Sequence, residues 1–462
     1  MHQIGIIGLG VMGASLARNA ARNGATVAIF NRTRERVDAF LKAHRSEGMF
    51  VPCKTYAYIV AALKPPRPIL LMVQAGNAVD EVIRELVPLL TKGDILIDGG
   101  NSHYRDTTRR EKDLAKKGIH FLGVGVSGGE KGALLGPSLM AGGSAEGYKM
   151  IEPLLRKMAA DDGQGGKCVA FLGPGGAGHF VKMVHNGIEY GLMQLIAETY
   201  QLLRDVSKKS NAESANIFAE WKSDPHLSSY LLEITSKILR KKDPETAQDL
   251  TDVIKDVASQ KGTGKWVVEA ALTYGVAIPT IAAALDMRIL SSQKELRVQR
   301  SHEMPFTASV TKEKGLAEDL RSALLLATIC TYAQGFDLLE RAGTEEHWNL
   351  RLRETARIWC GGCIIRSVLL KTFQDIFAGT SQAEFRLRTS FTSSAQKKWR
   401  TIVATGAEHG IPLPAMSASI SYFDTLRTAH LPANLTAAQR DFFGAHGYER
   451  TDKPGTFHTE WE

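Results

Sequence analysis

The sequence is poor in the features that mark secreted, membrane-spanning or metal-dependent proteins. Five cysteines in 462 residues, an odd and small number, fit a reducing compartment and exclude a disulfide framework. A strand-like QIGIIG begins three residues from the start, so we expect no targeting peptide and a cytoplasmic protein. The apolar residues 267–287 contain Glu269, Pro279 and Asp286, which excludes a membrane span. No side chains have the spacing of metal ligands, and no repeat or low-complexity tract is present.

Clustered charge of one sign is also absent, although the net charge is +8 and the pI is near 9.1. Lysines and arginines are scattered among 49 acidic residues, and no basic stretch is interleaved with aromatics as in single-strand binders. A net positive charge could indicate a protein that binds nucleic acid, but a small anionic substrate explains it equally well. We therefore expect neither nucleic acid nor membrane as a partner.

Two cysteines, Cys360 and Cys363, form the string WCGGC, which superficially resembles a redox dithiol. Such a site needs a strand before it and a helix that starts at the first cysteine. The preceding NLRLRETARIW predicts helix throughout, so we disfavour a redox function.

The length and the pattern of apolar residues predict more than one domain. Strand-like runs alternate with helical pattern up to CVAFLG, and from about residue 178 to 430 the pattern is almost entirely helical. We predict a dinucleotide-binding α/β domain with a doubly wound, mainly parallel sheet at 1–176, and a large all-helical domain at 177–432. Residues 433–462 form a C-terminal tail that is too short to fold alone and needs a partner surface. The glycine-rich 173–178 reads as a linker rather than a second phosphate loop.

The first strand, turn and helix carry GLGVMG, the spacing of a dinucleotide-binding loop. In such a loop Gly8 makes the tight turn, Gly10 admits the pyrophosphate and Gly13 lets helix and strand pack. The helix N-terminus then offers unpaired N–H groups and partial positive charge to the phosphates. Leu9, Val11 and Met12 complete the loop.

The second strand lacks the terminal acid that binds a ribose 2′-hydroxyl and ends instead in Asn31, Arg32 and Thr33. A guanidinium can clamp a 2′-phosphate that an acid would repel, so we predict NADP rather than NAD. The alternative is that Arg32 is one of several surface arginines beside Arg34 and Arg36.

The stretch GHFVKMVHNGIEY, residues 178–190, is the one around which we expect the rest of the chain to be arranged. Wound as a helix, it places five polar side chains on one stripe: Lys182, His185, Asn186, Glu189 and Tyr190. Apolar side chains fall on the opposite side: Val181, Val184, Ile188, Leu192 and Leu195. The plain alternative is that the polar stripe is a solvated face.

Two details favour a buried functional stripe. The stripe continues into the apolar residues Met193 and Ile196, which indicates that the polar patch lies on a helix that is otherwise buried on this face. Gly187 and Gly191 each cost about 1 kcal/mol relative to alanine, which indicates close approach to the helix backbone. Lys182 and Glu189 could then be the base and acid of a proton-transfer pair.

Further candidates follow strand ends and turns. Asn101 and the turn from Ser127 through Gly128 to Gly129 should face a ligand at the edge of a parallel sheet. QKGTGKW places Lys261 and Thr263 in a glycine-rich turn, and Arg288 lies in a helical stretch. Such cations often hold phosphate, although any one of them is more often merely solvated.

Together these strings closely resemble the decarboxylating 6-phosphogluconate dehydrogenase family of the pentose phosphate pathway. The matching strings run in the same order along the whole chain: GLGVMG, NRT, IDGGNSHYRDT, GVSGGEKGA, GHFVKMVHNGIEYG, QKGTGKW, GGCIIRS and RDFFGAHGYER. The resemblance implies a Rossmann domain, an all-helical domain and a homodimer whose tails reach into the neighbouring active sites. It also implies oxidation of 6-phosphogluconate by NADP with loss of CO₂, giving ribulose 5-phosphate.

The resemblance assigns roles to residues at matching positions. Lys182 is implied as the general base and Glu189 as the general acid. The implied cofactor contacts are residues 8–13, 31–33, Val73, Gln74, Ala75 and Asn101. The implied substrate contacts are Asn101, Ser127, Gly128, Gly129, His185, Asn186, Tyr190, Lys261, Arg288, and, from the partner chain, Arg440 and His446.

The chain departs from the family pattern at three positions. Gln74 replaces a customary lysine beside the nicotinamide, and Lys131 and Leu192 replace acids. None of these changes removes a proton-transfer group. A related NADP-dependent reductase of small hydroxy acids would lack QKGTGKW and RDFFGAH, and a silent NADP- or RNA-binding protein would not need the lysine and glutamate pair.

The implied chemistry requires a neutral lysine. Its pKa must therefore fall from about 10.4 toward neutrality. We expect burial and neighbouring cations such as Lys261 or Arg288 to lower it, against the opposing effect of Glu189.

Overall fold

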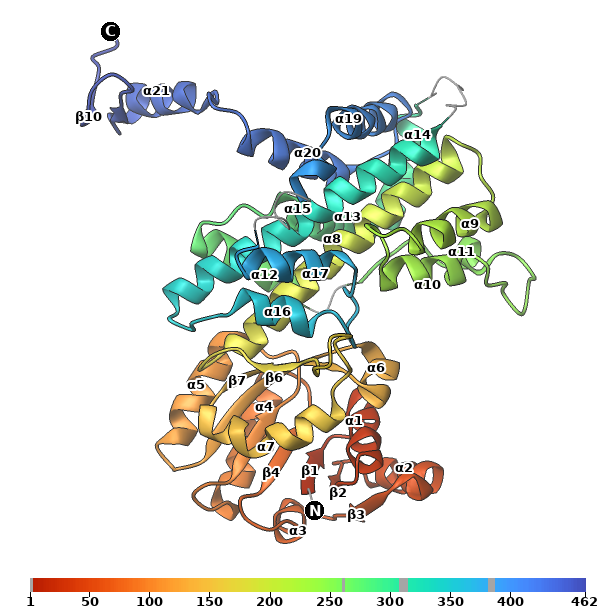
Figure 1. Ribbon diagram of the computed structural model, residues 1–462, viewed down its shortest axis with the longest axis vertical. Coiled ribbons are helices and arrows are strands. Elements are labelled where there is room, and N and C mark those ends of the chain that lie inside the picture. The colour runs from red at the N-terminus through yellow and green to blue at the C-terminus, as the bar shows by residue number, and fades with distance from the viewer. Residues whose placement is uncertain (1–2, 260–261, 307–314, 381–386) are drawn as a thin grey trace.

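The computed structural model describes residues 3–259, 262–306, 315–380 and 387–462, which form an α/β domain, a helical domain and a projecting C-terminal arm (Figure 1). Lys261 lies outside the described residues.

An eight-stranded sheet forms the α/β domain, in the order β3-β2-β1-β4-β5-β6-β7-β8. The strands are β1 Gln3–Ile7, β2 Thr26–Phe30, β3 Met49–Pro52, β4 Pro68–Leu71, β5 Ile95–Asp98, β6 His120–Ser127, β7 Ser138–Gly143 and β8 Val169–Phe171. All neighbours are parallel except β6 and β7. The order reverses between β1 and β4, which opens a crevice at their carboxyl ends. The predicted doubly wound, mainly parallel sheet is confirmed.

Helices cover both faces of this sheet, so the central strands are buried on both sides. They are α1 Val11–Arg22, α2 Arg34–His44, α3 Tyr56–Ala61, α4 Asn77–Leu86, α5 Tyr104–Ala115, α6 Gly129–Leu135 and α7 Ala145–Met158, with short turns η1 Arg45–Glu47 and η2 Val87–Leu89. Side chains of α1, α2 and α7 share one apolar core with the sheet, and those of α3, α4 and α5 share the other.

The helical domain is built around α8, Ala177–Asp205. Around it lie α9 Asn211–Lys222, α10 Tyr230–Ile238, α11 Leu250–Val253, α12 Thr263–Tyr274, α13 Pro279–Ser291, α14 Lys294–Glu303, α15 Leu316–Glu345, α16 Leu352–Ile358, α17 Leu369–Phe377, α19 Ser393–Glu408 and α20 Pro414–Leu426. The apolar residues 267–287 fall in α12 and α13, which are separate helices.

By length and composition, α15 is the one helix in the described part of the chain that could cross a membrane. In this fold 72% of its apolar window is buried, against α8 and α19 among others. The apolar composition of α15 is therefore explained by its place in the core of the helical domain.

Glycines let the start of α8 lie directly on the sheet. A Cβ at Gly178 would clash with the Met140 carbonyl oxygen and the Gly142 amide of β7. A Cβ at Gly125 of β6 would clash with the side chain of Lys182. Helix and sheet therefore touch backbone to backbone, and this contact fixes where Lys182 stands above β6.

The C-terminal arm consists of α21 Ala433–Gly444 and a small hairpin of β9 Tyr448–Glu449 and β10 Thr456–Phe457. Figure 1 shows it extending away from the helical domain. Within the arm, the buried Asp441 carboxylate accepts from the Thr459 amide at 3.0 Å and from the Trp461 indole N–H at 2.9 Å. The arm is thus internally ordered, although it projects from its own chain.

One buried carboxyl should make stability depend on pH. Glu198 of α8 accepts from the backbone amides of Ala415 and Met416 at 2.9 Å each, and burial raises its pKa to about 7. A folded-state pKa above the unfolded value stabilises the protein below the unfolded pKa, and this contribution is lost as pH rises through about 7. We expect Glu198→Gln to remove a fall in Tm between mildly acidic and mildly alkaline pH, measured by calorimetry. An identical slope in both proteins would contradict this.

Candidate active site

The glycine loop has the geometry predicted for a dinucleotide. Gly8 has φ +99° and packs against the Met72 carbonyl, where any Cβ would clash. Gly13 lies against the Gly8 carbonyl, so helix and turn pack closely. A Cβ at Gly10 would meet nothing within 4 Å. The open side of Gly10 is therefore where a ligand can approach the backbone.

Asn31, at the end of β2, holds this loop in place through two hydrogen bonds. Its Oδ1 accepts from the Leu9 amide at 2.9 Å, and its Nδ2 donates to the Thr33 carbonyl at 2.9 Å. Arg32 is exposed and lines a pocket of about 200 Å³ with Arg34 and Lys54. The side of the loop beyond β2 thus carries three cations suited to a phosphate.

Sequence reasoning missed Lys54 as a candidate. It follows the third strand as Arg32 follows the second, and neighbouring parallel strands end at the same sheet edge. The strand spacing could have identified it.

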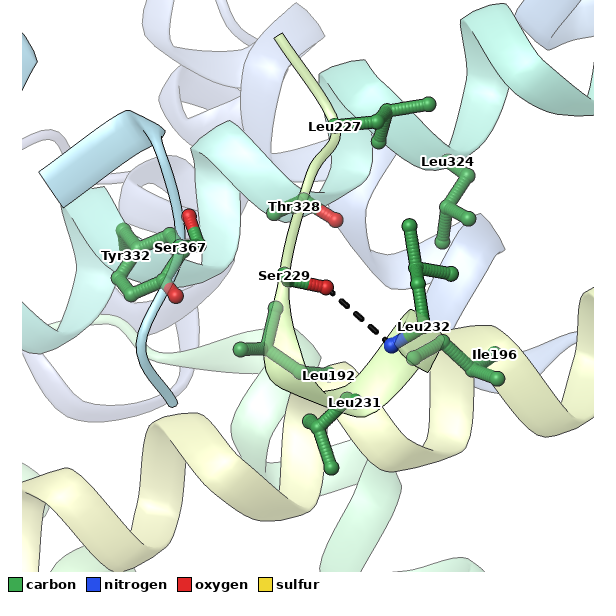
Figure 2. A pocket seen from close by; sticks show the side chains of 10 residues that line it. All are labelled: Leu192, Ile196, Leu227, Ser229, Leu231, Leu232, Leu324, Thr328, Tyr332 and Ser367. Carbon is green, nitrogen blue, oxygen red and sulfur yellow. Dashed lines mark hydrogen bonds between the residues drawn. The ribbon is translucent and has the colours of Figure 1, made fainter. Parts of the chain in front are cut away.

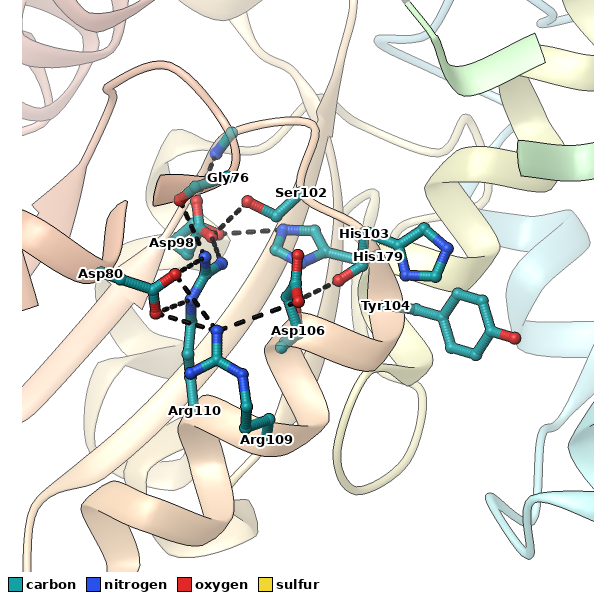
Figure 3. A network of polar contacts seen from close by, with 12 residues as sticks. Gly76, Asp80, Asp98, Ser102, His103, Tyr104, Asp106, Arg109, Arg110 and His179 are labelled. Carbon is teal, nitrogen blue, oxygen red and sulfur yellow. Dashed lines mark hydrogen bonds and ion pairs between the residues drawn. The ribbon is translucent and has the colours of Figure 1, made fainter. Parts of the chain in front are cut away.

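The loops after β4 and β5 are joined by a buried polar network, drawn in Figure 3. Asp98 at the end of β5 accepts from the Ser102 hydroxyl at 2.6 Å and from Arg110 at 3.5 Å. Arg110 also donates to the Gly76 carbonyl at 2.9 Å and pairs with Asp80 at 2.8 Å. The network ties the segment Val73, Gln74 and Ala75 to the loop that carries Asn101.

The same network reaches α8 through His179. Its Nε2 lies 3.2 Å from the Asp98 carbonyl oxygen, and its Nδ1 lies 2.6 Å from the Thr107 hydroxyl. Burial lowers the pKa of His179, which keeps the ring neutral. The cofactor-side loops and the start of α8 are therefore positioned by one set of contacts.

The predicted polar stripe on α8 is buried at its centre. Lys182 is 7% exposed and its Nζ donates to Asn186 Oδ1 at 2.8 Å. His185 is fully buried, with Nδ1 3.4 Å from Lys182 Nζ and Nε2 3.0 Å from the Ser127 hydroxyl. Asn186 Nδ2 donates to Thr263 at 3.3 Å. Residues from β6, α8 and α12 thus meet around one amine.

Electrostatics push the ionisable groups of this site toward their neutral forms. Burial lowers the pKa of Lys182, while Glu189 and the Cys363 thiol act in the opposite direction. Burial raises the pKa of Glu189 against the lowering effect of Lys182 and Arg288. Burial, then Lys182, lowers the pKa of His185 well below its usual value. A neutral amine and a protonated carboxyl are therefore favoured on one helix.

The expected help from Arg288 is not observed for Lys182, and Lys261, the other cation expected to contribute, lies outside the described residues. Arg288 is not among the groups that shift its pKa, and the charged neighbours that do so raise it. Arg288 instead lies 3.6 Å over the Tyr190 ring and donates to the Ser259 carbonyl at 3.1 Å. Among the described residues, burial is therefore the only cause that lowers the pKa of Lys182.

The sequence-based description of α8 was right about burial and wrong about Met193. The five apolar residues opposite the stripe are all buried, but Met193 is 42% exposed, although Leu195 and Leu202 farther along the helix are fully buried. At Gly187 a Cβ would crowd Val267 of α12 and Ile281 of α13, and at Gly191 it would clash with Thr331 of α15. The two glycines admit neighbouring helices.

The remaining positions that the sequence singled out lie in the turn after β6, in the apolar core and at the surface. Gly128, at φ +127°, and Gly129 turn the chain from β6 into α6 beside Ser127. Leu192, in place of an acid, packs in the apolar core, and Lys131 is exposed.

Arg440 and His446 lie exposed on the projecting arm, away from α8 of their own chain (Figure 1). One chain therefore does not bring them to Lys182.

The WCGGC string has no redox geometry. Helix α16 precedes it, all five cysteines are free thiols, and burial raises the pKa of Cys360 to about 11 and also raises that of Cys363. Figure 2 shows a small cavity between α8, α10 and α15, lined by Leu192, Leu232 and Leu324 among others. Its volume of about 20 Å³ leaves space for little more than a water, so it is a packing void.

Comparison with known proteins covers the whole chain. The NAD binding domain of 6-phosphogluconate dehydrogenase matches residues 3–173, and the 6-phosphogluconate dehydrogenase C-terminal domain matches residues 178–461. A decarboxylating 6-phosphogluconate dehydrogenase of Synechococcus elongatus is 50% identical over 100% of this chain and 99% of its own length. An NADP(+)-dependent, decarboxylating one of Bacillus subtilis is 47% identical over 100% and 99%.

A solved structure is similar throughout as well. It is Plasmodium falciparum 6-phosphogluconate dehydrogenase, described in its apo form, with its cofactor NADP+ and with its substrate 6-phosphogluconate. The TM-score is 0.95 at 40% identity, covering 99% of this chain and 100% of that chain.

Proposed function

This chain belongs to the 6-phosphogluconate dehydrogenase family, and we infer its chemistry from the buried Lys182 and its partners. It is an NADP-dependent enzyme that oxidises and decarboxylates 6-phospho-D-gluconate to D-ribulose 5-phosphate and CO₂, a step of the pentose phosphate pathway. The similarity extends through the helical domain and arm, which disfavours the smaller hydroxy-acid reductases. The observation that carries the proposed mechanism is a desolvated lysine directly over Gly125 of β6.

The crevice suits the cofactor. The open face of Gly10 and the start of α1 would receive the pyrophosphate, and Arg32, Arg34 and Lys54 would hold the 2′-phosphate. The loop with Val73, Gln74 and Ala75, together with Asn101, would flank the nicotinamide, with Leu9, Val11 and Met12 in the glycine loop. NADP supplies the hydride acceptor.

In the proposed mechanism Lys182 removes the proton of the C3 hydroxyl as hydride leaves C3. The resulting 3-keto acid loses CO₂, and the protonated lysine stabilises the charge that forms on the carbonyl oxygen and returns its proton there, which gives the enediol. Glu189 then protonates C1 of the enediol. His185 and Asn186 hold the amine in place through the contacts described above.

The substrate contacts are proposed from the same arrangement. Ser127, Gly128 and Gly129 lie on the β6 side of Lys182, and Tyr190 with Arg288 lies on the α12 and α13 side. Asn101 stands at the neighbouring strand end. Lys261, which lies outside the described residues, is proposed from the family resemblance alone.

Direct assay tests this function. Purified protein should release NADPH, followed by absorbance, together with CO₂ when given 6-phosphogluconate and NADP. NAD should support much slower turnover. NADPH without CO₂ would contradict the decarboxylating step.

The pH dependence of the activity should reflect the ionisation of Lys182 and Glu189 on α8. The pKa of Lys182 is lowered and that of Glu189 is raised, so both move toward neutrality. Activity should rise with pH as Lys182 loses its proton and fall as Glu189 loses its own. We expect Glu189→Gln to lower kcat by roughly 10²–10⁴-fold and to abolish the alkaline limb. A retained alkaline limb would argue against Glu189 as the acid.

Cofactor preference should depend on the cations beyond β2. Arg32→Ala or Lys54→Gln should weaken NADP binding by about 1.5–3 kcal/mol for each lost charged hydrogen bond, with NAD binding unchanged. Arg36→Gln is the matched control, because Arg36 is exposed on α2 and does not line the pocket. Equal losses for NAD and NADP would place these side chains away from the 2′-phosphate.

We also propose a homodimer in which each arm enters the partner's active site and supplies Arg440 and His446. The arm's exposed apolar side chains support this: Leu435, Phe442, Phe443 and Trp461. A cytoplasmic location and domains at 1–176, 177–432 and 433–462 are proposed as well. The domain division is supported by the start of α8 at Ala177.

A further inference from the structure

A cationic pocket lies on the side of the molecule where α10 meets the segment after α16. Its volume is about 330 Å³, within the usual size of small-molecule sites. Lys222, Arg366 and Lys371 line it, and among the described residues none of the three has an ion-pair partner.

Each of the two acids that line the pocket has an ion-pair partner outside it, and Glu233 also interacts electrostatically with Lys222 and Arg366. Asp162 pairs with Arg357 at 2.8 Å and accepts two backbone amides, while Glu233 pairs with Lys237 at 2.5 Å. Arg357 and Lys237 are not lining residues. The pocket therefore retains an excess of positive charge.

The arginine of this pocket is held in place for binding. The Arg366 guanidinium stacks 3.7 Å over the Tyr230 ring and donates to the Cys363 carbonyl at 2.8 Å. An arginine has five N–H donors in a fixed planar fork, and the other donors of Arg366 have no partner among the described residues. Stacking removes much of the freedom that a binding arginine would otherwise lose.

Two helices begin at the wall of the same pocket. Ser229 is the N-cap of α10, Val368 is the N-cap of α17, and a β-bridge joins Ser229 to Ser367. Both N-caps line the pocket. Most N–H groups of the first turns already have acceptors, for example Tyr230 N–H with the Arg366 carbonyl and Leu232 N–H with the Ser229 hydroxyl. The helix ends therefore add partial positive charge to that of the three cations rather than free donors.

We propose that this pocket binds a small phosphorylated anion and acts on the substrate loop at Ser127–Gly129. A phosphate group matches the fork of Arg366 and the positive charge of the pocket. None of the residues that line the pocket belongs to the Lys182 centre.

The segment between the two sites provides the link. The Trp359 ring lies 5.7 Å from the His185 ring, and the Gly362 carbonyl accepts from the Ser138 amide at 3.1 Å and abuts Gly128. Arg366 and Cys360 lie on the pocket side of this segment. The effect on the substrate loop rests on the function proposed above, whereas binding does not.

Cys360 offers a local reporter of occupancy. It lines the pocket and is the one cysteine of five that is not fully buried. Inorganic pyrophosphate is the probe, and alkylation of Cys360 by N-ethylmaleimide at mildly alkaline pH is followed by peptide mass spectrometry. We expect saturable, several-fold protection that is lost in Arg366→Met and in the double variant Lys222→Met, Lys371→Met.

Lys117→Met, which removes an exposed lysine that follows α5 and does not line the pocket, should retain the protection. Unchanged alkylation of wild-type Cys360 at millimolar pyrophosphate, or equal protection in every variant, would overturn binding. For the link, pyrophosphate should change the KM for 6-phosphogluconate more in wild type than in the lysine double variant. Equal changes in both would assign the effect to the active site itself and overturn the link, and an inactive wild type would instead contradict the proposed function.

Discussion

Replacing Lys182 with methionine is expected to reduce kcat by roughly 10²–10⁴-fold, the usual contribution of a positioned acid–base group. Methionine keeps most of the volume and fills the space above Gly125, so the contact between α8 and the sheet should survive. Burial already disfavours the charged amine, and its loss should not destabilise the fold. NADPH release measured at saturating substrate checks this prediction.

Two measurements make the result specific. NADP binding by Lys182→Met should remain near that of wild type, because the glycine loop and Arg32 are untouched. Lys149→Met, at an exposed position on α7, should retain full turnover. Near-normal kcat for Lys182→Met would rule out this residue as the base and direct attention to His185, 3.4 Å away.

Arg440→Ala is expected to lower kcat/KM by an amount corresponding to about 2–5 kcal/mol, the cost of removing one partner of a buried charged contact. Arg440 is exposed in its own chain, so the loss would arise only if another chain buries it. The variant should remain dimeric by light scattering, because the apolar side chains of the arm are unchanged.

Mixed dimers test whether Arg440 acts in the active site of the partner chain or in that of its own chain. Lys182→Met and Arg440→Ala chains, unfolded and refolded together, should recover roughly a quarter of wild-type activity, since half of the random dimers have one intact site. Each variant refolded alone is the control. No recovery in verified mixed dimers would show that Arg440 serves its own chain.

Much of the fold followed from local patterns in the sequence. Strand lengths, the glycine spacing around Gly10 and the apolar face of α8 each depend on neighbouring residues, so periodicity was sufficient to predict them. The buried centre of the polar stripe was inferred from Gly187 and Gly191, and the structure shows helices α12, α13 and α15 at those positions.

What could not be predicted depends on contacts between distant residues. The network of Asp98, Arg110 and His179 joins positions up to 81 residues apart in one chain, and no local pattern marks it. Burial and cations such as Arg288 were expected to lower the pKa of Lys182, whereas among the described residues only burial does so. Arg440 and His446 were named only through the family resemblance, because a site that a second chain would complete, as proposed here, leaves no spacing to recognise.

The backbone contact between α8 and the sheet limits how the active site can open. With no side chain between Gly178 and β7, the two cannot swing apart without breaking close packing along the whole start of the helix. A hinge at the boundary between the domains is therefore disfavoured. Movement of α12 or α13, or of the arm that we propose enters from a partner chain, is then the expected route for reactants, while the amine of Lys182 keeps a fixed height over the sheet.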